Sequence, residues 1–180
     1  KAVILNGGET MTNGIPSTSY GWGRMNLANS FVDDMFGNFA FWDSRIGLMT
    51  NGQRDHTILV EASGRPLRVT LDWTDRESSC ITPSCQSLPK LVNDLNLEVI
   101  APDGRRYNGN DLTAPYDDQR DVLNNVERVE ILNPLQGAYT LRVRAQNVPL
   151  GSQDFALVAS YDNLLLVPTA QICMDNGVPC

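Results

Sequence analysis

The stretch Leu91–Gly104, LVNDLNLEVIAPDG, decides the fold expected for this chain. Apolar and polar side chains alternate from Leu95 to Ala101, which is the period-two pattern of a strand with one face in a core. The three residues that follow, Pro-Asp-Gly, predict a tight turn, because Pro presets φ and Gly readily takes the positive φ that such turns need. Asn93 and Asp94 place amide and carboxylate oxygens at the start of this strand. The sequence therefore predicts a sheet protein with polar loops gathered at one end of this strand.

Further strands are expected on both sides of that stretch. The same alternation, or an aromatic and β-branched composition, occurs at 39–42, 57–62, 67–73, 126–132, 139–145 and 155–161. Roughly seven or eight strands with no helical period between them indicate an all-β fold, an antiparallel β-sandwich of the jelly-roll type.

The first part of the chain shows helical rather than strand-like patterns. Lys1–Leu5 is apolar and compatible with a helix that Asn6-Gly7-Gly8 would end with a left-handed cap, and a second short helix is expected within 21–31. Two short helices around a polar loop cannot form a core of their own. We expect residues 1–36 to be the remnant of a preceding domain, residues 37–166 to form the jelly roll, and residues 167–180 to form a disulfide-closed tail.

Charge and composition exclude some classes of function. The chain has 180 residues and a net charge of −7, which argues against a nucleic-acid partner because phosphate contacts need clustered Lys and Arg. No apolar run approaches the roughly 20 residues of a membrane span. An acidic balance suits a protein that binds hard cations, although a merely soluble surface gives the same balance.

Four cysteines form two local pairs, Cys80 with Cys85 and Cys173 with Cys180. Each pair can close a short disulfide loop in an exported protein, which is the preferred interpretation. A four-cysteine zinc site is the alternative, but such sites have tighter CxxC pairs. The sequence therefore predicts two disulfides and a secreted, extracellular protein.

No complete catalytic apparatus is visible in the sequence. The single histidine, His56, lies in a polar GQRDH stretch and is expected to be a solvated loop residue. The chain contains no GxSxG nucleophile setting, no GxGxxG or P-loop, and no HExxH. No catalytic residue is predicted within these 180 residues.

Oxygen-bearing side chains gather in two short regions, 93–94 and 108–127. They are Asn93, Asp94, Asn108, Asn110, Asp111, Asp117, Asp118, Asp121, Asn124, Asn125 and Glu127. Calcium binds six to eight oxygens from carboxylates, amides and carbonyls in flexible loops. Asp and Asn also favour turns for their own backbone hydrogen bonds, and composition alone does not separate the two explanations.

Several segments together resemble the C-terminal jelly-roll domain of subtilisin-like serine proteases (peptidase family S8), in particular the alkaline, oxidatively stable branch. They are LDWTD (71–75), LVNDLNLEVIAPDG (91–104), NGNDLTAPYDD (108–118), NNVERVEI (124–131) and GAYTLRVRAQNVPLGSQDFALVAS (137–160). GWGRMNLANSF (21–31) resembles the closing segment of the family's catalytic domain, and KAVILNGG (1–8) resembles the end of the helix before it. The loop with Cys80 and Cys85 and the tail from Val167 depart from the pattern.

The resemblance implies a function for the chain. It would be the C-terminal, calcium-binding part of a secreted serine endopeptidase, stabilising the catalytic domain that would be its partner, while protein substrates would be cleaved by the parent enzyme. The family's His-Gly-Thr-His and Gly-Thr-Ser-Met-Ala motifs are absent here, so the resemblance carries over no triad residue. Because the family's barrel domain binds Ca²⁺, the resemblance favours a metal site built from Asp94, Asp111, Asp117, Asp118, Asn125 and Glu127.

A function of another class is a carbohydrate- or surface-binding module. Sandwich modules often bind glycans on exposed aromatic side chains, and Trp42, Tyr107 and Tyr116 are candidates for such contacts. Packing in the core (Trp42) or within loops (the tyrosines) is the simpler explanation, because the sequence shows no periodic aromatic strip.

Overall fold

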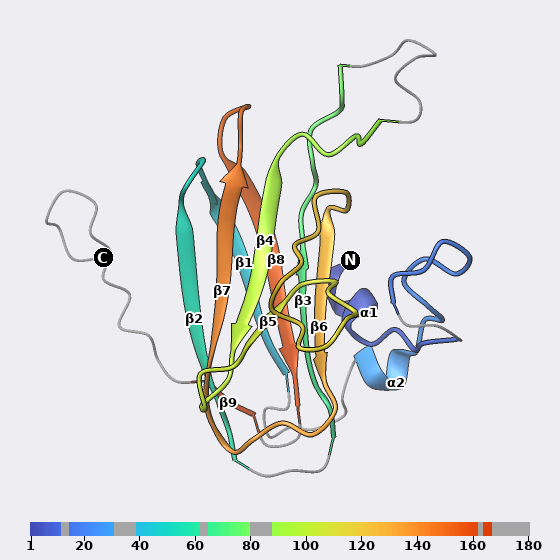
Figure 1. Cartoon of the computed structure of the whole chain (residues 1–180), viewed down its shortest axis with the longest axis vertical. Coiled ribbons are helices and arrows are strands. Elements are labelled where there is room, and N and C mark those ends of the chain that lie inside the picture. Colours follow the sequence, from blue (N-terminus) through green and yellow to red (C-terminus); the bar gives the residue numbers. More distant parts are fainter. Residues whose placement is uncertain (12–14, 31–38, 62–64, 80–87, 162–163, 167–180) are drawn as a thin grey trace, which may run out of the picture.

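The computed structural model of the chain describes residues 1–11, 15–30, 39–61, 65–79, 88–161 and 164–166. Two antiparallel sheets pack face to face, with a small helical segment beside one of them (Figure 1). The strands are β1 Phe39–Leu48, β2 Gln53–Val60, β3 Leu67–Asp72, β4 Asp94–Ile100, β5 Arg106–Asn108, β6 Val126–Ile131, β7 Gly137–Asn147, β8 Gln153–Ser160 and β9 Leu164–Leu166. The predicted all-β sandwich is confirmed.

The order of the strands is that of a jelly roll. One sheet has the order β1-β8-β3-β6 and the other has the order β5-β4-β7-β2-β9. Strands that follow one another along the chain therefore alternate between sheets, except that β4 and β5 are neighbours in the second sheet, and β6 and β1 are the edges of the first sheet. Strand β4, which contains the organising stretch, lies between β7 and the short β5, and it also approaches β6 of the facing sheet.

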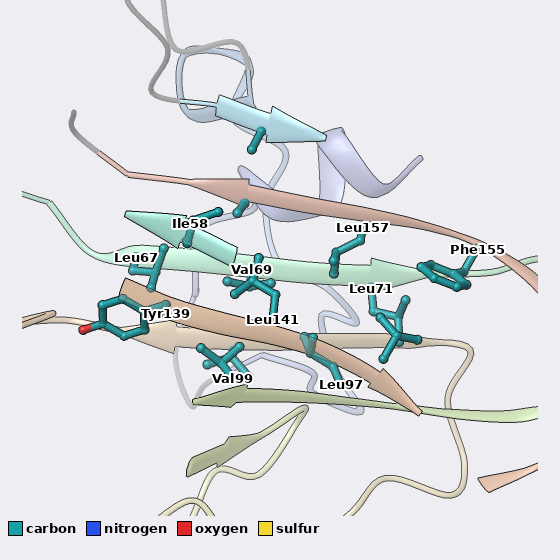
Figure 2. Packing of buried hydrophobic residues seen from close by; sticks show 14 of the residues in the cluster. Ile58, Leu67, Val69, Leu71, Leu97, Val99, Tyr139, Leu141, Phe155 and Leu157 are labelled. Atoms are coloured by element: carbon teal, nitrogen blue, oxygen red, sulfur yellow. The ribbon is translucent and has the colours of Figure 1, made fainter. Parts of the chain in front are cut away.

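The alternating residues of the predicted strands form the core between the two sheets (Figure 2). Leu97 and Val99 of β4 face Val69 and Leu71 of β3 across the interior, and each has at most 1% of its surface exposed. Burying a side chain of this size stabilises a fold by about 1.5–3 kcal/mol, so the period-two pattern is the main source of the sandwich's stability. The turn after β4 also follows the prediction, with Gly104 at φ +87°.

Strand boundaries differ from the prediction where the sequence is polar or the strand is short. Strand β2 begins at Gln53, because Gln53–His56 pair in register with β7 despite their polarity. Strands β5 and β9 have three residues each, which is too short for an alternation to be recognised.

The N-terminal segment is docked on the outer face of the first sheet. Helix α1 (Ala2–Asn6) contacts β3 and β8, and the shorter α2 (Leu27–Ser30) packs on α1. Asn6 is fully buried: its amide donates to Ser160 Oγ at 2.8 Å, and its carbonyl oxygen accepts from Thr70 Oγ1 at 2.9 Å. The expected left-handed cap is wrong, because Gly7 has φ −82° and continues the right-handed turn.

Arg128 of β6 adds further hydrogen bonds between the sandwich and this N-terminal segment. Its guanidinium donates to the carbonyl oxygens of Gly8 at 2.8 Å and Leu5 at 3.3 Å, and pairs with Glu130 at 3.3 Å. The side chain is only 3% exposed, so these bonds form away from water. Residues 1–8 and the sandwich are thus joined through polar groups inaccessible to solvent.

Candidate metal centre

A long loop, 109–125, connects β5 to β6 and lies along the side of the sandwich where β4 meets β6 (yellow in Figure 1). Its first residue, Gly109, donates its N–H to Leu97 O of β4 at 2.9 Å. A Cβ at this position would overlap the carboxylate of Glu127, so only glycine allows the loop to lie this close. The loop therefore closes over the part of the β4 edge that β5 does not cover, and it encloses the Glu127 side chain.

Glu127 is the most unusual charged side chain of this region. It is 1% exposed, and one carboxylate oxygen, Oε2, accepts the Leu97 N–H at 2.6 Å. The other oxygen, Oε1, is buried and has no hydrogen-bond partner among the described residues. Burial raises the pKa of this carboxyl well above its ordinary value, and the neighbouring charges of Asp121 and Asp94 raise it further. A buried carboxylate is costly unless it is protonated or compensated by a positive charge.

Asp94, at the start of β4, shares this environment. Burial raises its pKa to about 6, and the charge of Asp121 adds to the rise. Asn96, two residues along the same face of β4, donates to Asp94 Oδ1 at 3.2 Å, while its own Oδ1 is buried and without a partner among the described residues. Carboxylate and amide oxygens from β4, β6 and the loop therefore face one region.

Asn110 and Asp121 hold the two ends of the loop together there. The Asn110 amide donates to Asp121 Oδ2 at 2.5 Å and to Val126 O at 2.7 Å, and Asn124 donates to the same Asp121 oxygen at 2.6 Å. Asn110 has φ +59°, a conformation that asparagine tolerates better than most residues. These bonds explain part of the Asn and Asp content of the loop as ordinary loop structure.

The six residues predicted as metal ligands do not all come together. Asp94 and Glu127 lie in the same charged region. Asp111 accepts the N–H groups of Thr113 at 3.0 Å and Gln119 at 3.3 Å, and so organises its own loop. Asn125 donates to Trp73 O at 2.9 Å and extends the β3–β6 pairing.

The remaining two predicted ligands, Asp117 and Asp118, are exposed on the loop. Asn96 and Asp121, which were not among the predicted ligands, lie with Asp94 and Glu127 instead. The period-two spacing of Asp94 and Asn96 on one face of a strand was the signal that would have indicated Asn96.

The oxygens present suit a hard cation, although they do not yet surround one point. Calcium prefers carboxylate and amide oxygens, and the unpartnered atoms Glu127 Oε1 and Asn96 Oδ1 are of these two kinds. Within the described ranges, no group of three or more His, Cys, Asp and Glu side chains is close enough to hold a metal ion as it stands. A cation would therefore have to draw Asp121 and Glu127 together by a movement of the loop or of the side chains.

His56 differs from its prediction. It lies within β2, is partly buried, and its ring centroid is 4.5 Å from that of Trp42 on β1. Burial lowers its pKa to about 4, and the charge of Arg54 lowers it further. The histidine is thus a neutral packing residue at the side of the sandwich where β1 faces β2. Trp42, a candidate for glycan contacts, is occupied by the same packing.

The other two aromatic candidates lie together. The rings of Tyr107 and Tyr116 are stacked with centroids 6.2 Å apart. The four cysteines, Cys80, Cys85, Cys173 and Cys180, lie outside the described residues, so their pairing remains a prediction. In the part of the chain that is described, no helix has the length and apolar character needed to cross a bilayer.

Comparisons with known proteins add little. No family model and no curated protein matches the chain. Among solved structures, the chain is similar to the Bacillus licheniformis lipase BlEst2 in its propeptide form, with 14% identity over 69% of this chain and a TM-score of 0.42. The chain spans 22% of that lipase chain. A similarity at this level carries no argument about function.

Proposed function

We propose that this chain is the C-terminal, calcium-binding β-sandwich part of a secreted subtilisin-like serine endopeptidase, and that it stabilises the catalytic domain of that enzyme. The observation that carries the proposal is the buried carboxylate of Glu127, which has one unpartnered oxygen and lies near Asp94 and Asp121. Without compensation, this group disfavours the folded state at neutral pH, because burial penalises its charged form. A bound Ca²⁺ would remove that cost.

Four residues of this chain would hold the ion. Glu127 and Asp94 would supply carboxylates from β6 and β4, and Asn96 would supply an amide oxygen. Asp121 would supply a carboxylate from the loop in exchange for some of its hydrogen bonds to Asn110, Leu123 and Asn124. The ion would link the 109–125 loop to both sheets of the sandwich. Asp111, Asp117, Asp118 and Asn125 then have other roles in the loop.

The contacts of the N-terminal segment support the second half of the proposal. Asn6 and Arg128 join residues 1–8 to the sandwich through buried hydrogen bonds. If residues 1–36 are the end of a catalytic domain, the sandwich holds that end in place and so opposes unfolding of the domain. Catalysis itself would belong to residues preceding Lys1.

A covalent probe of serine nucleophiles tests the proposal. The protein isolated from its natural source should react with a fluorophosphonate probe, and peptide sequencing of that protein should find residues 1–180 in the labelled species. The chain 1–180 alone should not react. Chelation by EDTA should shorten the thermal half-life of the labelled enzyme. The proposal fails if residues 1–180 occur in a protein that carries no reactive serine.

The carbohydrate-binding alternative keeps one supporting observation, the stacked Tyr107 and Tyr116. Trp42 no longer supports it, because its ring packs against His56. Pulldown on insoluble polysaccharides is the direct test, and absence of retention on any of them removes the alternative.

A further inference from the structure

A groove runs along the outer edge of β6, between the N-terminal segment and the stacked tyrosines. Its volume is about 450 Å³, within the range of ligand-binding clefts. Residues 128–133 form its floor, and Thr10 and Ile15 form one wall. The opposite wall consists of Tyr107, Asn108, Asp111, Leu112 and Tyr116.

The floor of this groove is a free sheet edge. In an antiparallel pair, the backbone groups of alternate residues point toward the partner strand. Trp73 N–H donates to Asn125 O at 3.2 Å, and the β3–β6 register continues from this pair without a shift. The backbone N–H and C=O groups of the odd-numbered residues of β6 therefore point toward β3. The backbone groups of Arg128 and Glu130 therefore point away from β3 and into the groove.

One end of this edge is already paired by the chain itself. Asn110 N–H donates to Arg128 O at 2.9 Å, and Asn110 Oδ1 accepts the Arg128 N–H at 2.9 Å. Asn110 thus makes the two hydrogen bonds that one residue of an added strand would make with Arg128. At the next position along the edge, no described residue bonds to the backbone N–H or C=O of Glu130.

The side chains around this edge suit an extended peptide. Leu112, Leu132 and Tyr116 are large apolar or aromatic side chains with 55%, 67% and 40% of their surface exposed. The charged groups of the floor are engaged with each other, since Arg128 and Arg68 both pair with Glu130. Asp117 and Asp118, which directly follow Tyr116, are exposed acidic groups without a described cationic partner. An occupant would therefore have apolar side chains on alternate residues and a basic residue beside them.

We propose that this groove binds an extended polypeptide segment, which adds as a strand to the free edge of β6 at Glu130. Main-chain hydrogen bonds would supply affinity, and the exposed Leu112, Leu132 and Tyr116 would select apolar side chains. A glycan would use the tyrosines, but it would leave the Glu130 backbone groups without a strand-like partner. The idea that the bound peptide is a substrate of an endopeptidase rests on the proposed function. The groove itself and its preference for a peptide do not depend on that function.

The test uses the chain 1–180 and a fluorescein-labelled hexapeptide, Lys-Leu-Thr-Leu-Thr-Leu, capped at its C-terminus. Its fluorescence anisotropy should rise on titration with the protein. Two N-methylated versions carry the methyl groups on alternate sets of amides, so each blocks the hydrogen bonds of one strand edge. One version should bind about fivefold or more weakly than the other, because only one edge faces β6.

Two pairs of variants locate the site. Glu130→Pro removes the N–H that faces the groove, at an edge position where proline is tolerated, and Glu130→Ala removes the same carboxylate but keeps the N–H. The Pro variant should bind about fivefold or more weakly than the Ala variant. Leu132→Ser should also weaken binding, whereas Ile46→Ser, at a 79% exposed position on β1, should not.

Three results would overturn the proposal. They are equal binding of the two N-methylated peptides, no rise in anisotropy up to the solubility limit of the protein, and retention on a polysaccharide that is lost in Tyr116→Ala. The peptide measurements need no variant protein, so they decide even if Glu130→Pro does not fold. The peptide measurements also need no protease activity. Their outcome is therefore independent of the fluorophosphonate experiment that tests the proposed function.

Discussion

Replacing Arg128 by methionine should release the N-terminal segment from the sandwich. Methionine keeps most of the apolar stem but removes the guanidinium that donates to Gly8 O and Leu5 O. Hydrogen bonds of charged groups contribute about 1.5–3 kcal/mol each, and breaking a buried charge pair costs about 3–5 kcal/mol. Two of the three Arg128 contacts are long, at 3.3 Å, so we expect a loss of roughly 3 kcal/mol in the free energy of unfolding.

Arg68→Met is the matched control. Arg68 also pairs with Glu130, at 2.7 Å, but its side chain is 21% exposed and it makes no described contact with residues 1–8. An exposed ion pair of this kind contributes about 0–1 kcal/mol, so the control should lose far less stability. Urea unfolding followed by tryptophan fluorescence measures both losses.

Hydrogen exchange shows where the loss acts. The amides of Leu5, Gly7 and Gly8 are hydrogen-bonded within α1 and at its C-terminal end, and Arg128→Met should speed their exchange more than that of the β3 amides. The reasoning is refuted if Arg128→Met costs no more than Arg68→Met and leaves the exchange of these three amides unchanged.

Three other properties follow from the charges and cysteines. With EDTA present, wild type should lose stability relative to Asp94→Asn as pH rises from about 4 to 6, by on the order of 1–2 kcal/mol after allowance for partial exposure. In this pH range the Asp94 carboxyl of the folded protein still holds a proton that the unfolded chain has lost. Urea unfolding at each pH measures the difference in stability. NMR titration should find the pKa of His56 near 4, so protonation of its ring destabilises the fold as pH falls from about 6.5 to 4; a pKa near 6.5 would contradict its burial. The unreduced protein should weigh about 4 Da less than the reduced protein, one hydrogen per cysteine, and free thiols at all four positions would overturn the predicted disulfides and the argument for export.

The strands of the core were predictable from the sequence because burial on one face imposes a period of two. Leu95, Leu97, Val99 and Ala101 alternate strictly, and all four are buried. The first half of β2 was not predictable in this way. Its polar residues, Gln53–His56, are held in the sheet by pairing with β7, and that partner is distant in sequence.

The candidate metal centre was predicted only in outline. Local composition indicated that oxygens gather around β4 and the following loop. It did not show which carboxylates point inward, because this depends on how the loop folds back onto β4. Gly109 and Asn110 determine that path, and it buries Glu127 while leaving Asp117 and Asp118 exposed.

The central claim is that Ca²⁺ compensates the buried Glu127 carboxylate. Thermal unfolding of wild type, Glu127→Gln and Asp118→Ala, each in EDTA and in millimolar calcium, tests it most directly. At a free calcium concentration a hundredfold above Kd, the wild type and Asp118→Ala should gain about 2.7 kcal/mol, or roughly 5–11 °C in Tm. Glu127→Gln should not respond to calcium, and in EDTA at neutral pH it should be at least as stable as wild type, because it removes a carboxylate whose charge burial penalises. A wild-type Tm indifferent to calcium and EDTA, with no calcium found by elemental analysis, or a Glu127→Gln variant that responds like wild type, would contradict the claim.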